Sequence, residues 1–507
     1  MFNVIKMALQ LLLQFVLRTV LIYVLGKEYI GLNGLFTNIL GLLNLVELGI
    51  GGAIVFSLYK PIAEKNDEKI KALVALYKKF YAIIAFVVLG LGLVAMLFLP
   101  YLIQGEAPAN VNIYIVYAVY LFNTFVSYFA AHKRSLIFAN QRNDIESKIR
   151  IVCISALNVL QIVLLLVFKN YYYYIILMPI FTLIESILIK IEADKHFPID
   201  LKNAGKLDDE TKSELKKKIY AMSLHQLASA LVLSTDNILI SAIFGLSAVG
   251  VYSNYLLIIT SIISIIGLIT TSLQASVGNM IATTNPDYVF EKYKMLNLLF
   301  TWFIGFCSIC FLCLFQPFIL LWTKDSGYLF EFIVVVALVV SFYLKESLGL
   351  TVMFKTTAQL VWHDRFSPLV QGITNIVCSI LFAYIFGIVG IFMGTIVSTL
   401  VAPFWWAPRT LYKHYFNKGL KNYWCSYLLI TAFSAVVAVV MYILCDLMPA
   451  GLGWFVVRVV ACVLIPNLLF LLSFRNIGII EFAKEYLWRR RKISQNTGLK
   501  NSDEKEQ

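Results

Sequence analysis

The chain has 507 residues, of which 60% are hydrophobic and 14% are charged, and its mean hydropathy is +0.80. Because a soluble domain has roughly a quarter charged residues, this composition excludes a water-soluble globular protein. The formal net charge of +13 would suit a nucleic-acid partner. The basic residues are distributed as in a membrane protein, however, and we expect no nucleic acid.

Apolar runs recur from Met7 to Leu472, and each is long enough to cross a hydrocarbon core of about 30 Å. We therefore expect an all-α integral membrane protein with about fourteen transmembrane helices. The predicted spans are 5–25, 32–58, 76–102, 111–136, 148–168, 172–192, 220–243, 249–281, 295–319, 330–354, 367–386, 389–408, 424–446 and 452–473.

The basic residues predict the topology. Six of the 42 Lys and Arg residues lie inside spans or in odd-numbered loops: Arg18, Lys27, Lys169, Lys324, Lys345 and Arg458. The others lie in the N-terminus, the even-numbered loops with their adjoining span ends, and the C-terminal tail. Since basic residues collect on the cytoplasmic side, we expect both termini there. This basic side would also attract anionic membrane lipids.

The chain repeats itself at an offset of about 219 residues. Residues 25–32 (Leu-Gly-Lys-Glu-Tyr-Ile-Gly-Leu) match residues 244–251 (Phe-Gly-Leu-Ser-Ala-Val-Gly-Val), although the identities are few and chance is the alternative. Both segments are predicted to be tight turns between the first and second spans of a half, where glycine lets the chain reverse direction. Because the offset contains an even number of spans, the halves should have the same orientation and form a parallel repeat.

This repeat predicts two like-oriented six-helix lobes followed by two extra C-terminal helices. The expected parts are an N-terminal lobe (1–196), a cytoplasmic linker (197–218), a C-terminal lobe (219–415), helices 13 and 14 (416–476), and a cytoplasmic tail, first amphipathic and then disordered (477–507). Two lobes facing each other would enclose a cavity that can open to either side. This is typical of a transporter, with a duplicated structural protein as the alternative.

Charged residues inside spans are candidate functional residues, because a buried charge is costly and usually faces a cavity or a partner. The candidates are Arg18, Glu47, Glu185, Asp236, Lys345, Glu346 and Arg458. Arg18 and Asp236 lie at nearly equivalent places in the two halves. They would form a structural ion pair or contact an anionic substrate. Lys345 and Glu346 point about 100° apart on a helix, and snorkelling is the alternative for them.

Basic residues also surround the predicted cytoplasmic mouth. The residues expected to form this vestibule are Arg134, Arg142, Arg150 and Arg365. Topology alone explains such a cluster. The functional alternative is a cationic vestibule for a phosphate-bearing substrate, since Arg and Lys bind phosphate well. Residues 171–174, four consecutive tyrosines, are interpreted as interfacial anchors.

Three of the eight cysteines, Cys307, Cys310 and Cys313, lie along one predicted helical face. Their neighbours are Phe, Leu and Ile, with no His or carboxylate. We therefore interpret them as small buried hydrophobic residues rather than metal ligands.

Several segments resemble bacterial polysaccharide flippases of the Wzx type, which belong to the superfamily that includes multidrug/toxin extruders and lipid II flippases. These segments are residues 25–36, 47–51, 58–61 and 235–255. The resemblance implies transport of a polyprenyl-pyrophosphate-linked oligosaccharide from the cytoplasmic to the outer leaflet of a bacterial cell membrane by alternating access. It also implies a role in surface polysaccharide or capsule synthesis, with a polysaccharide polymerase and glycosyltransferases as candidate partners.

In a transporter of this kind, the chemistry of the charged residues suggests their roles. The expected substrate-binding residues are Arg18, Lys60, Asp236, Lys345 and Lys355, the basic ones contacting pyrophosphate. The expected ion-coupling residues are Glu47, Asp236 and Glu346, for H⁺ or Na⁺. The sequence contains no G-x-x-x-x-G-K-[ST] loop, so we expect coupling to an ion gradient and no cofactor.

Two other classes of function stay open. A multidrug extruder of the same superfamily would need a cavity in which acidic residues dominate. A membrane enzyme, such as a polysaccharide polymerase or transferase, would usually carry a large extramembrane loop with clustered carboxylates or His. The outward loops here hold few polar groups, so we expect a transporter rather than an enzyme.

Overall fold

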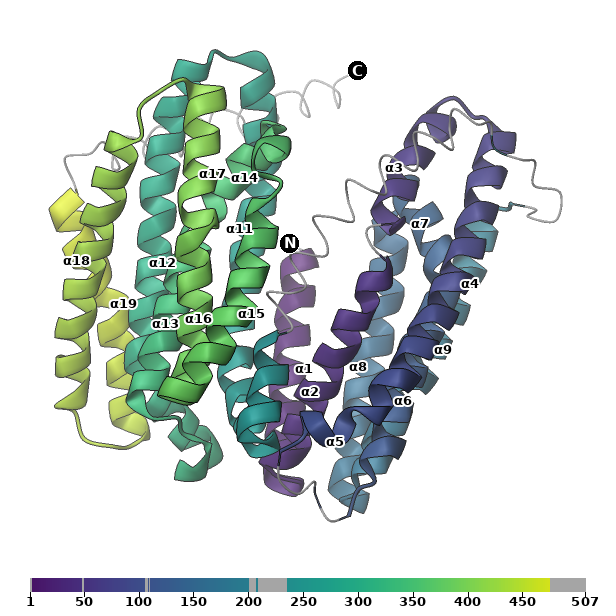
Figure 1. Ribbon diagram of the computed structural model, residues 1–507, viewed down its shortest axis with the longest axis horizontal. Helices are drawn as coiled ribbons and strands as arrows, with labels where there is room; N and C mark the ends of the chain where they lie inside the picture. The colour runs from purple at the N-terminus through teal and green to yellow at the C-terminus, as the bar shows by residue number, and fades with distance from the viewer. Residues whose placement is uncertain are drawn as a thin grey trace, which may run out of the picture. The chain divides into compact units, whose positions relative to one another are not determined.

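The computed structural model describes residues 2–47, 50–104, 108, 110–199, 207 and 235–474, and every regular element in these ranges is helical (Figure 1). The elements of the first half are α1 (Phe2–Val24), α2 (Lys27–Leu43), η1 (Asn44–Glu47), α3 (Ile50–Ala63), α4 (Asp67–Leu97), α5 (Leu99–Leu102), α6 (Ile113–Ser127), η2 (Tyr128–Ala130), α7 (Ala131–Ala139), α8 (Asn143–Phe168) and α9 (Tyr171–His196).

The second half begins with a helix at Thr235–Phe244. Its other elements are α11 (Leu246–Thr283), α12 (Pro286–Thr323), η3 (Ser326–Tyr328), α13 (Phe332–Ser347), α14 (Gly349–Thr357), η4 (Leu360–Asp364), α15 (Ser367–Phe386), α16 (Ile388–Val401), α17 (Pro403–Leu411), η5 (Tyr412–Phe416), α18 (Lys421–Asp446) and α19 (Leu452–Phe474).

Within the described ranges, 11 helical segments are long and apolar enough to cross a membrane. Shorter apolar helices at Gln10–Val24, Ile50–Ala63 and Thr235–Phe244 correspond to the predicted first, second and seventh spans. The chain is therefore an all-α, multi-pass membrane protein, as predicted. Most of the predicted linker and the whole predicted tail lie outside the described residues, and the lobe boundaries stay a prediction.

Several of the predicted spans are interrupted, among them the second and the tenth, which carry charged residues at the break. The 3₁₀ turn η1 divides the second span into α2 and α3, and Leu348 separates α13 from α14 in the tenth. A 3₁₀ stretch within a span often marks a hinge or a functional site. Glu47 is the last residue of η1, and Lys345 and Glu346 lie in the last turn of α13. These three charged residues therefore lie at breaks rather than inside continuous helices.

The chain divides into two compact units. The first unit is Met1–Ile269, Trp322–Leu344 and Val361–Ala407, and the second is Thr270–Leu321, Lys345–Leu360 and Pro408–Gln507. Each unit has its own buried core and is described by itself.

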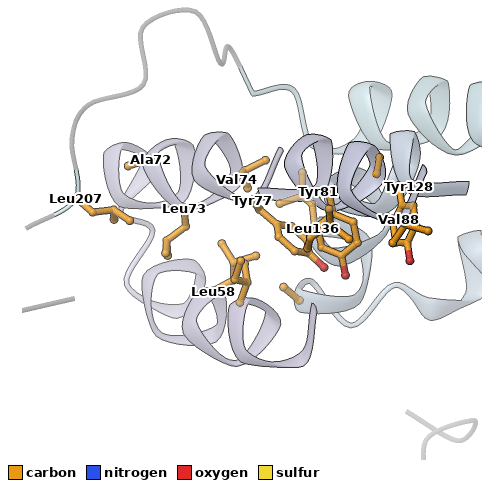
Figure 2. Close-up of a cluster of buried hydrophobic side chains, with 14 residues drawn as sticks. Leu58, Ala72, Leu73, Val74, Tyr77, Tyr81, Val88, Tyr128, Leu136 and Leu207 are labelled. Atoms are coloured by element: carbon orange, nitrogen blue, oxygen red, sulfur yellow. The ribbon is translucent and has the colours of Figure 1, made fainter. Parts of the chain in front are cut away.

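In the first unit, a core lies between α3, α4 and α7 (Figure 2). Leu58 and Leu73 are fully buried there. Tyr77, Tyr81 and Tyr128 belong to the same cluster. The ring centroid of Tyr81 lies 4.5 Å from that of Tyr77 and 5.8 Å from that of Tyr128. Buried phenol hydroxyls usually require a hydrogen-bond partner. This core is therefore a place where polar groups of neighbouring elements must gather.

The two halves of the chain meet in a reciprocal contact within the first unit. A Cβ added at Gly31 would lie 2.1 Å from the carbonyl oxygen of Leu246, and one added at Gly250 would lie 2.0 Å from that of Lys27. Gly31 and Gly250 are equivalent in the repeat, and so are Lys27 and Leu246. This reciprocity is what a two-fold relation between the halves produces, and it supports the predicted repeat.

The turns that precede this contact are also equivalent. Gly26 and Gly245 both have positive φ, at 100° and 84°, a conformation that glycine adopts without steric cost. Just beyond them, Ser247 Oγ donates a 2.9 Å hydrogen bond to Glu28 Oε1, joining two residues 219 positions apart. The glycine turns predicted from the sequence are therefore present, and they bring α2 and α11 together.

Close backbone packing recurs between α15 and α16. A Cβ added at Gly390 would lie 2.0 Å from Phe382 O, and one at Gly394 would lie 2.3 Å from Ser379 Oγ. Small residues four positions apart let transmembrane helices approach closely. The hydroxyl of Ser379 donates to Ile391 O at 3.0 Å. The hydroxyl of Ser379 is therefore satisfied within this helix pair.

The second unit has an aromatic core between α12 and η5. Phe290, Tyr293, Tyr412 and Phe416 pack with ring centroids between 5.0 and 5.9 Å apart. The Tyr293 hydroxyl shares a 2.9 Å hydrogen bond with Thr351 Oγ1. The buried phenol of Tyr293 thus brings a polar partner into an apolar core.

We predict that Gly31→Ala and Gly250→Ala destabilise the protein to a similar extent. Each Cβ would force the same two backbones apart, and overpacking of this kind costs about 1–3 kcal/mol. The measurement is the thermal unfolding midpoint of purified protein in detergent. Gly90→Ala in α4 is the matched control, because its Cβ would meet nothing within 4 Å. A Gly31→Ala protein as stable as this control would contradict the reciprocal contact.

Candidate functional site

A cavity of about 510 Å³ lies in the first unit beside the tyrosine core. Its walls come from η1, α3, α4, η2 and α7, and its polar lining residues are Glu47, Tyr59, Tyr77, Tyr81, Ser127, Tyr128, Arg134, Ser135 and Asn143. Two of the sequence-predicted residues, Glu47 and Arg134, thus lie in one pocket. The sequence had assigned them separate roles, in ion coupling and in the vestibule.

Glu47 is held by the tyrosine core. Tyr81, from α4, donates a hydrogen bond to Glu47 Oε1. A Cβ at Gly51 would lie 2.8 Å from the Tyr81 hydroxyl and 2.9 Å from Glu47 Oε1. The absence of a side chain at Gly51 therefore leaves the room in which this carboxylate and phenol meet. A carboxylate bonded to a neutral phenol in an apolar core can gain or lose a proton without breaking an ion pair.

Arg134 forms an ion pair with Glu185 from α9, and the two side chains are only 24% and 14% exposed. Its Nε atom is buried and, within the described part of the chain, has no hydrogen-bond partner. This ion pair explains how the charge of Glu185, which the sequence placed inside a span, is compensated. The cation of Arg134 is thus matched by Glu185.

A second polar cluster surrounds Arg18 on α1. The groups that interact with its guanidinium are the phenols of Tyr174, Tyr120 and Tyr171, and Asp236 is not among them. The Nη1 atom of Arg18 is buried and has no hydrogen-bond partner among the residues that the structure describes. A guanidinium surrounded by neutral groups retains the capacity to bind an anion.

Asn33 on α2 organises these phenols. Tyr120 and Tyr171 both donate to Asn33 Oδ1, and Asn33 Nδ2 donates to the Tyr174 hydroxyl at 3.3 Å. Tyr171 and Tyr174 are 2% and 7% exposed, so the interpretation of these two as interfacial anchors was wrong. Helical spacing turns them inward. Tyr173, at 46% exposed, lies on the outer side.

Asp236 belongs to a third cluster, in the second half. Thr395 Oγ1 lies 3.5 Å from Asp236 Oδ1 and accepts a 3.0 Å hydrogen bond from Asn375. The phenol of Tyr252 lies in the field of this carboxylate. Tyr252 and Asn33 are equivalent in the repeat, so both halves carry a polar cluster at the same level of their second helices.

The other predicted substrate residues are not gathered in either cluster. Lys60 is exposed on α3 and lies 3.9 Å from Glu64. Lys355 is buried in α14, and Lys345 and Glu346 are partly buried at the end of α13, all in the second unit. Their roles in substrate binding and coupling stay predictions.

Like Arg134, the other three predicted vestibule arginines already have neighbours. Arg142 bonds Asp144 through Nε at 2.9 Å. Arg150 lies 3.6 Å from Glu146. The guanidinium of Arg365 stacks on Trp362, 4.2 Å from the ring centroid. Cation–carboxylate pairs on a surface are weak, so these arginines can exchange partners, and the vestibule stays a prediction.

Arg458, which the sequence placed near the outer end of span 14, caps α18. Its Nε donates to Cys445 O at 3.1 Å and its Nη2 to Met448 O at 2.6 Å. A cation is favourable at a helix C-terminus, where carbonyls lack intrahelical partners. Its role is therefore structural.

We predict that Asn33→Ala destabilises the protein by about 1–3 kcal/mol, the cost of leaving buried polar groups without a partner. The phenols of Tyr120 and Tyr171 would lose their acceptor beside Arg18. Thermal unfolding in detergent measures the effect. Asn38→Ala on the same helix is the control, since the hydrogen bond of Asn38 within the described residues goes to Gly34 O of its own helix, at 2.8 Å. Equal losses in the two variants would remove Asn33 from its organising role.

Comparisons with known proteins add to this geometry. No protein-family profile matches the sequence, and no curated protein matches it. Solved structures do match. The lipid II flippase MurJ in an inward closed conformation has a TM-score of 0.66 at 14% identity, over 94% of this chain and 98% of that chain. An inward-facing multidrug resistance MATE family transporter of the MOP superfamily has a TM-score of 0.58 at 17% identity, over 78% and 93%.

A MOP superfamily transporter from Pyrococcus furiosus, whose binding pocket has reversed polarity, has a TM-score of 0.54 at 17% identity, over 82% of this chain and 94% of that chain. At such identities the likeness establishes the fold. The chain is therefore a multi-pass membrane protein with the fold that these transporters share.

Proposed function

We propose that the protein is a flippase that moves polyprenyl-pyrophosphate-linked oligosaccharides from the cytoplasmic to the outer leaflet of a bacterial cell membrane by alternating access. The product would supply surface polysaccharide synthesis. A sugar chain and a pyrophosphate cannot cross hydrocarbon unaided, because each buried polar group needs a partner. A protein of this fold would supply those partners while the lipid tail stays in the bilayer.

The observation that carries the proposal is the guanidinium of Arg18. This guanidinium lies on a membrane-spanning helix, and its neighbours are three phenols that hydrogen-bond with Asn33. Its Nη1 atom is buried and has no hydrogen-bond partner in the described ranges. An unmatched cation in a span usually faces a substrate path or an anion. Arginine forks match phosphate oxygens in geometry and charge. A pyrophosphate headgroup is therefore the ligand class that this site favours.

The phenols around Arg18 support the same ligand. They donate to Asn33 Oδ1 and can turn to donate to phosphate or sugar oxygens instead. Tyrosine also offers a ring face against which sugars pack. The fold likeness to a lipid II flippase supports lipid-linked cargo, and the resemblance of residues 25–61 and 235–255 to Wzx-type proteins supports an oligosaccharide.

We propose further that transport is coupled to a proton gradient through Glu47. This carboxylate lies at the break between α2 and α3, where a change of helix angle needs little unfolding. Its partner is the neutral Tyr81 hydroxyl. Protonation would change that hydrogen bond and the packing of the η1 turn around it.

Arg18→Gln should lower the rate of flipping by about 30-fold or more, because loss of a buried charged hydrogen-bond partner costs about 2–5 kcal/mol. The measurement uses proteoliposomes and the accessibility of a polyprenyl-pyrophosphate oligosaccharide to an impermeant glycosidase. Arg18→Lys should recover part of the rate, since it keeps the charge but loses the fork. Lys190→Gln, which removes an exposed cation from α9, is the control. Wild-type flipping by Arg18→Gln would contradict the assignment of the site.

Glu47→Gln should leave flipping insensitive to an imposed pH gradient, because an amide cannot exchange the proton. Wild-type vesicles should flip faster with the gradient than without it. Glu64→Gln removes an exposed carboxylate just beyond α3 and should keep the wild-type response. A Glu47→Gln protein that still responds to the gradient would assign the coupling to another group.

A multidrug extruder is the second candidate, and the Glu47 pocket favours it. Its lining includes the carboxylate of Glu47, which is hydrogen-bonded to a neutral phenol, and the rings of Tyr77, Tyr81 and Tyr128. Aromatic faces attract organic cations. The same vesicles distinguish the two functions. Gradient-driven uptake of a cationic dye without glycolipid flipping would establish the extruder and overturn the flippase.

A further inference from the structure

Three buried thiols meet in the second unit, far from the polar clusters in sequence. Cys313 lies on α12, Cys445 on α18 and Cys462 on α19, and their sulfur atoms all lie within 4.8 Å of one another. The sulfurs of Cys445 and Cys462 are 3.8 Å apart. The sequence placed Cys313 with Cys307 and Cys310 along a helix. The structure instead joins it to two cysteines of the last two helices.

The surroundings of these thiols are apolar. Ile309, Val437 and Met441 are buried in the same cluster, and Cys310 packs against its edge. A thiol that only fills space needs no other thiol beside it. Here three separate helices each bring one to the same point, so a single ligand bound by all three would tie α12 to the α18–α19 pair.

The spacing suits a metal ion. A tetrahedral Zn²⁺ with Zn–S bonds of about 2.3 Å places two ligand sulfurs about 3.8 Å apart. The Cys445–Cys462 separation already has this value. The third sulfur needs only a small side-chain movement to reach it. A donor set of thiolates alone selects soft or borderline ions such as Zn²⁺, Cd²⁺ and Cu⁺ over Mg²⁺ and Ca²⁺.

The charges also balance. Three thiols that bind a divalent ion release three protons and leave a complex with one net negative charge. The guanidinium of Arg458, which donates to the carbonyl of Cys445 at 3.1 Å, supplies a positive charge beside it. The assembly is then neutral overall, which limits its cost within a membrane.

We propose that Cys313, Cys445 and Cys462 form a binding site for a soft, thiophilic metal ion of the Zn²⁺ type. Its fourth coordination position is left to water or to Cys310. The site fastens α12 to α18 and α19. It is independent of the proposed transport function.

The test is a titration of the full-length protein in detergent with Cd²⁺, which reports thiolate coordination by an ultraviolet charge-transfer band. We expect one ion per chain, the band, and release of three protons. Removing a residue that only hydrogen-bonds to a metal ligand typically lowers metal affinity by about 10–100-fold, and removing a ligand costs more. Cys445→Ser and Cys462→Ser should therefore weaken binding by about 100-fold or more. Cys307→Ser, two turns from Cys313 on the same helix, should bind as the wild type does.

A measurement without variants complements the titration. Bound Cd²⁺ should protect Cys313, Cys445 and Cys462 from a membrane-permeant maleimide, as read by mass spectrometry, and leave Cys425 reactive. The proposal is overturned by the absence of a band, by equal protection of Cys425, or by Cys307→Ser weakening binding as much as Cys445→Ser. A Cys445–Cys462 disulfide in protein taken from native membranes would also overturn it.

Discussion

The contact on which the arrangement of the first unit depends is the one between Gly31 and Gly250 and the backbones that they touch. Two helix starts can approach this closely only where no side chain intervenes. Gly31 contacts the backbone of Leu246, and Gly250 contacts the backbone of the equivalent residue, Lys27. The contact is therefore the same when the two halves are exchanged. It holds α2 and α11 at backbone distance, next to two glycine turns with positive φ.

The bilayer imposes the second constraint. No water reaches its core, so buried polar groups have to find partners within the protein. Each half solves this within its own helices, through Asn33 and its phenols in one case and through Thr395 and Asn375 in the other. In the Arg18 cluster, one guanidinium nitrogen is nevertheless buried and has no hydrogen-bond partner among the described residues. Under the proposed function, this unmatched donor binds the headgroup of the cargo.

The sequence predicted the fold well because hydropathy and charge position report the bilayer directly. The order of spans, the parallel repeat and the glycine turns all came from short-range patterns. The breaks in the second and tenth spans were not foreseen, because the longer segments on both sides of Glu47 and of the Lys345–Leu348 stretch are apolar. Hydropathy averages over such a break.

The candidate site was predicted only in part, because partners distant in sequence decide its chemistry. Arg18 was singled out correctly as a buried charge, but its neighbours lie on α6 and α9 and could not be inferred from α1. The spacing of Tyr171 and Tyr174, three residues apart in a tyrosine run, was the available signal for their inward position. The thiol cluster was missed for the same reason, since Cys313 meets cysteines more than a hundred residues away.

The account's central claim is that this protein carries lipid-linked oligosaccharide across the membrane. The most direct measurement depletes the protein from its own cells and determines the amount and leaflet of polyprenyl-pyrophosphate oligosaccharides. The account predicts that complete repeat units accumulate on the cytoplasmic side while surface polysaccharide is lost, and that wild-type protein reverses both changes. Unchanged surface polysaccharide without accumulation, or unpolymerised units already on the outer face, would contradict it.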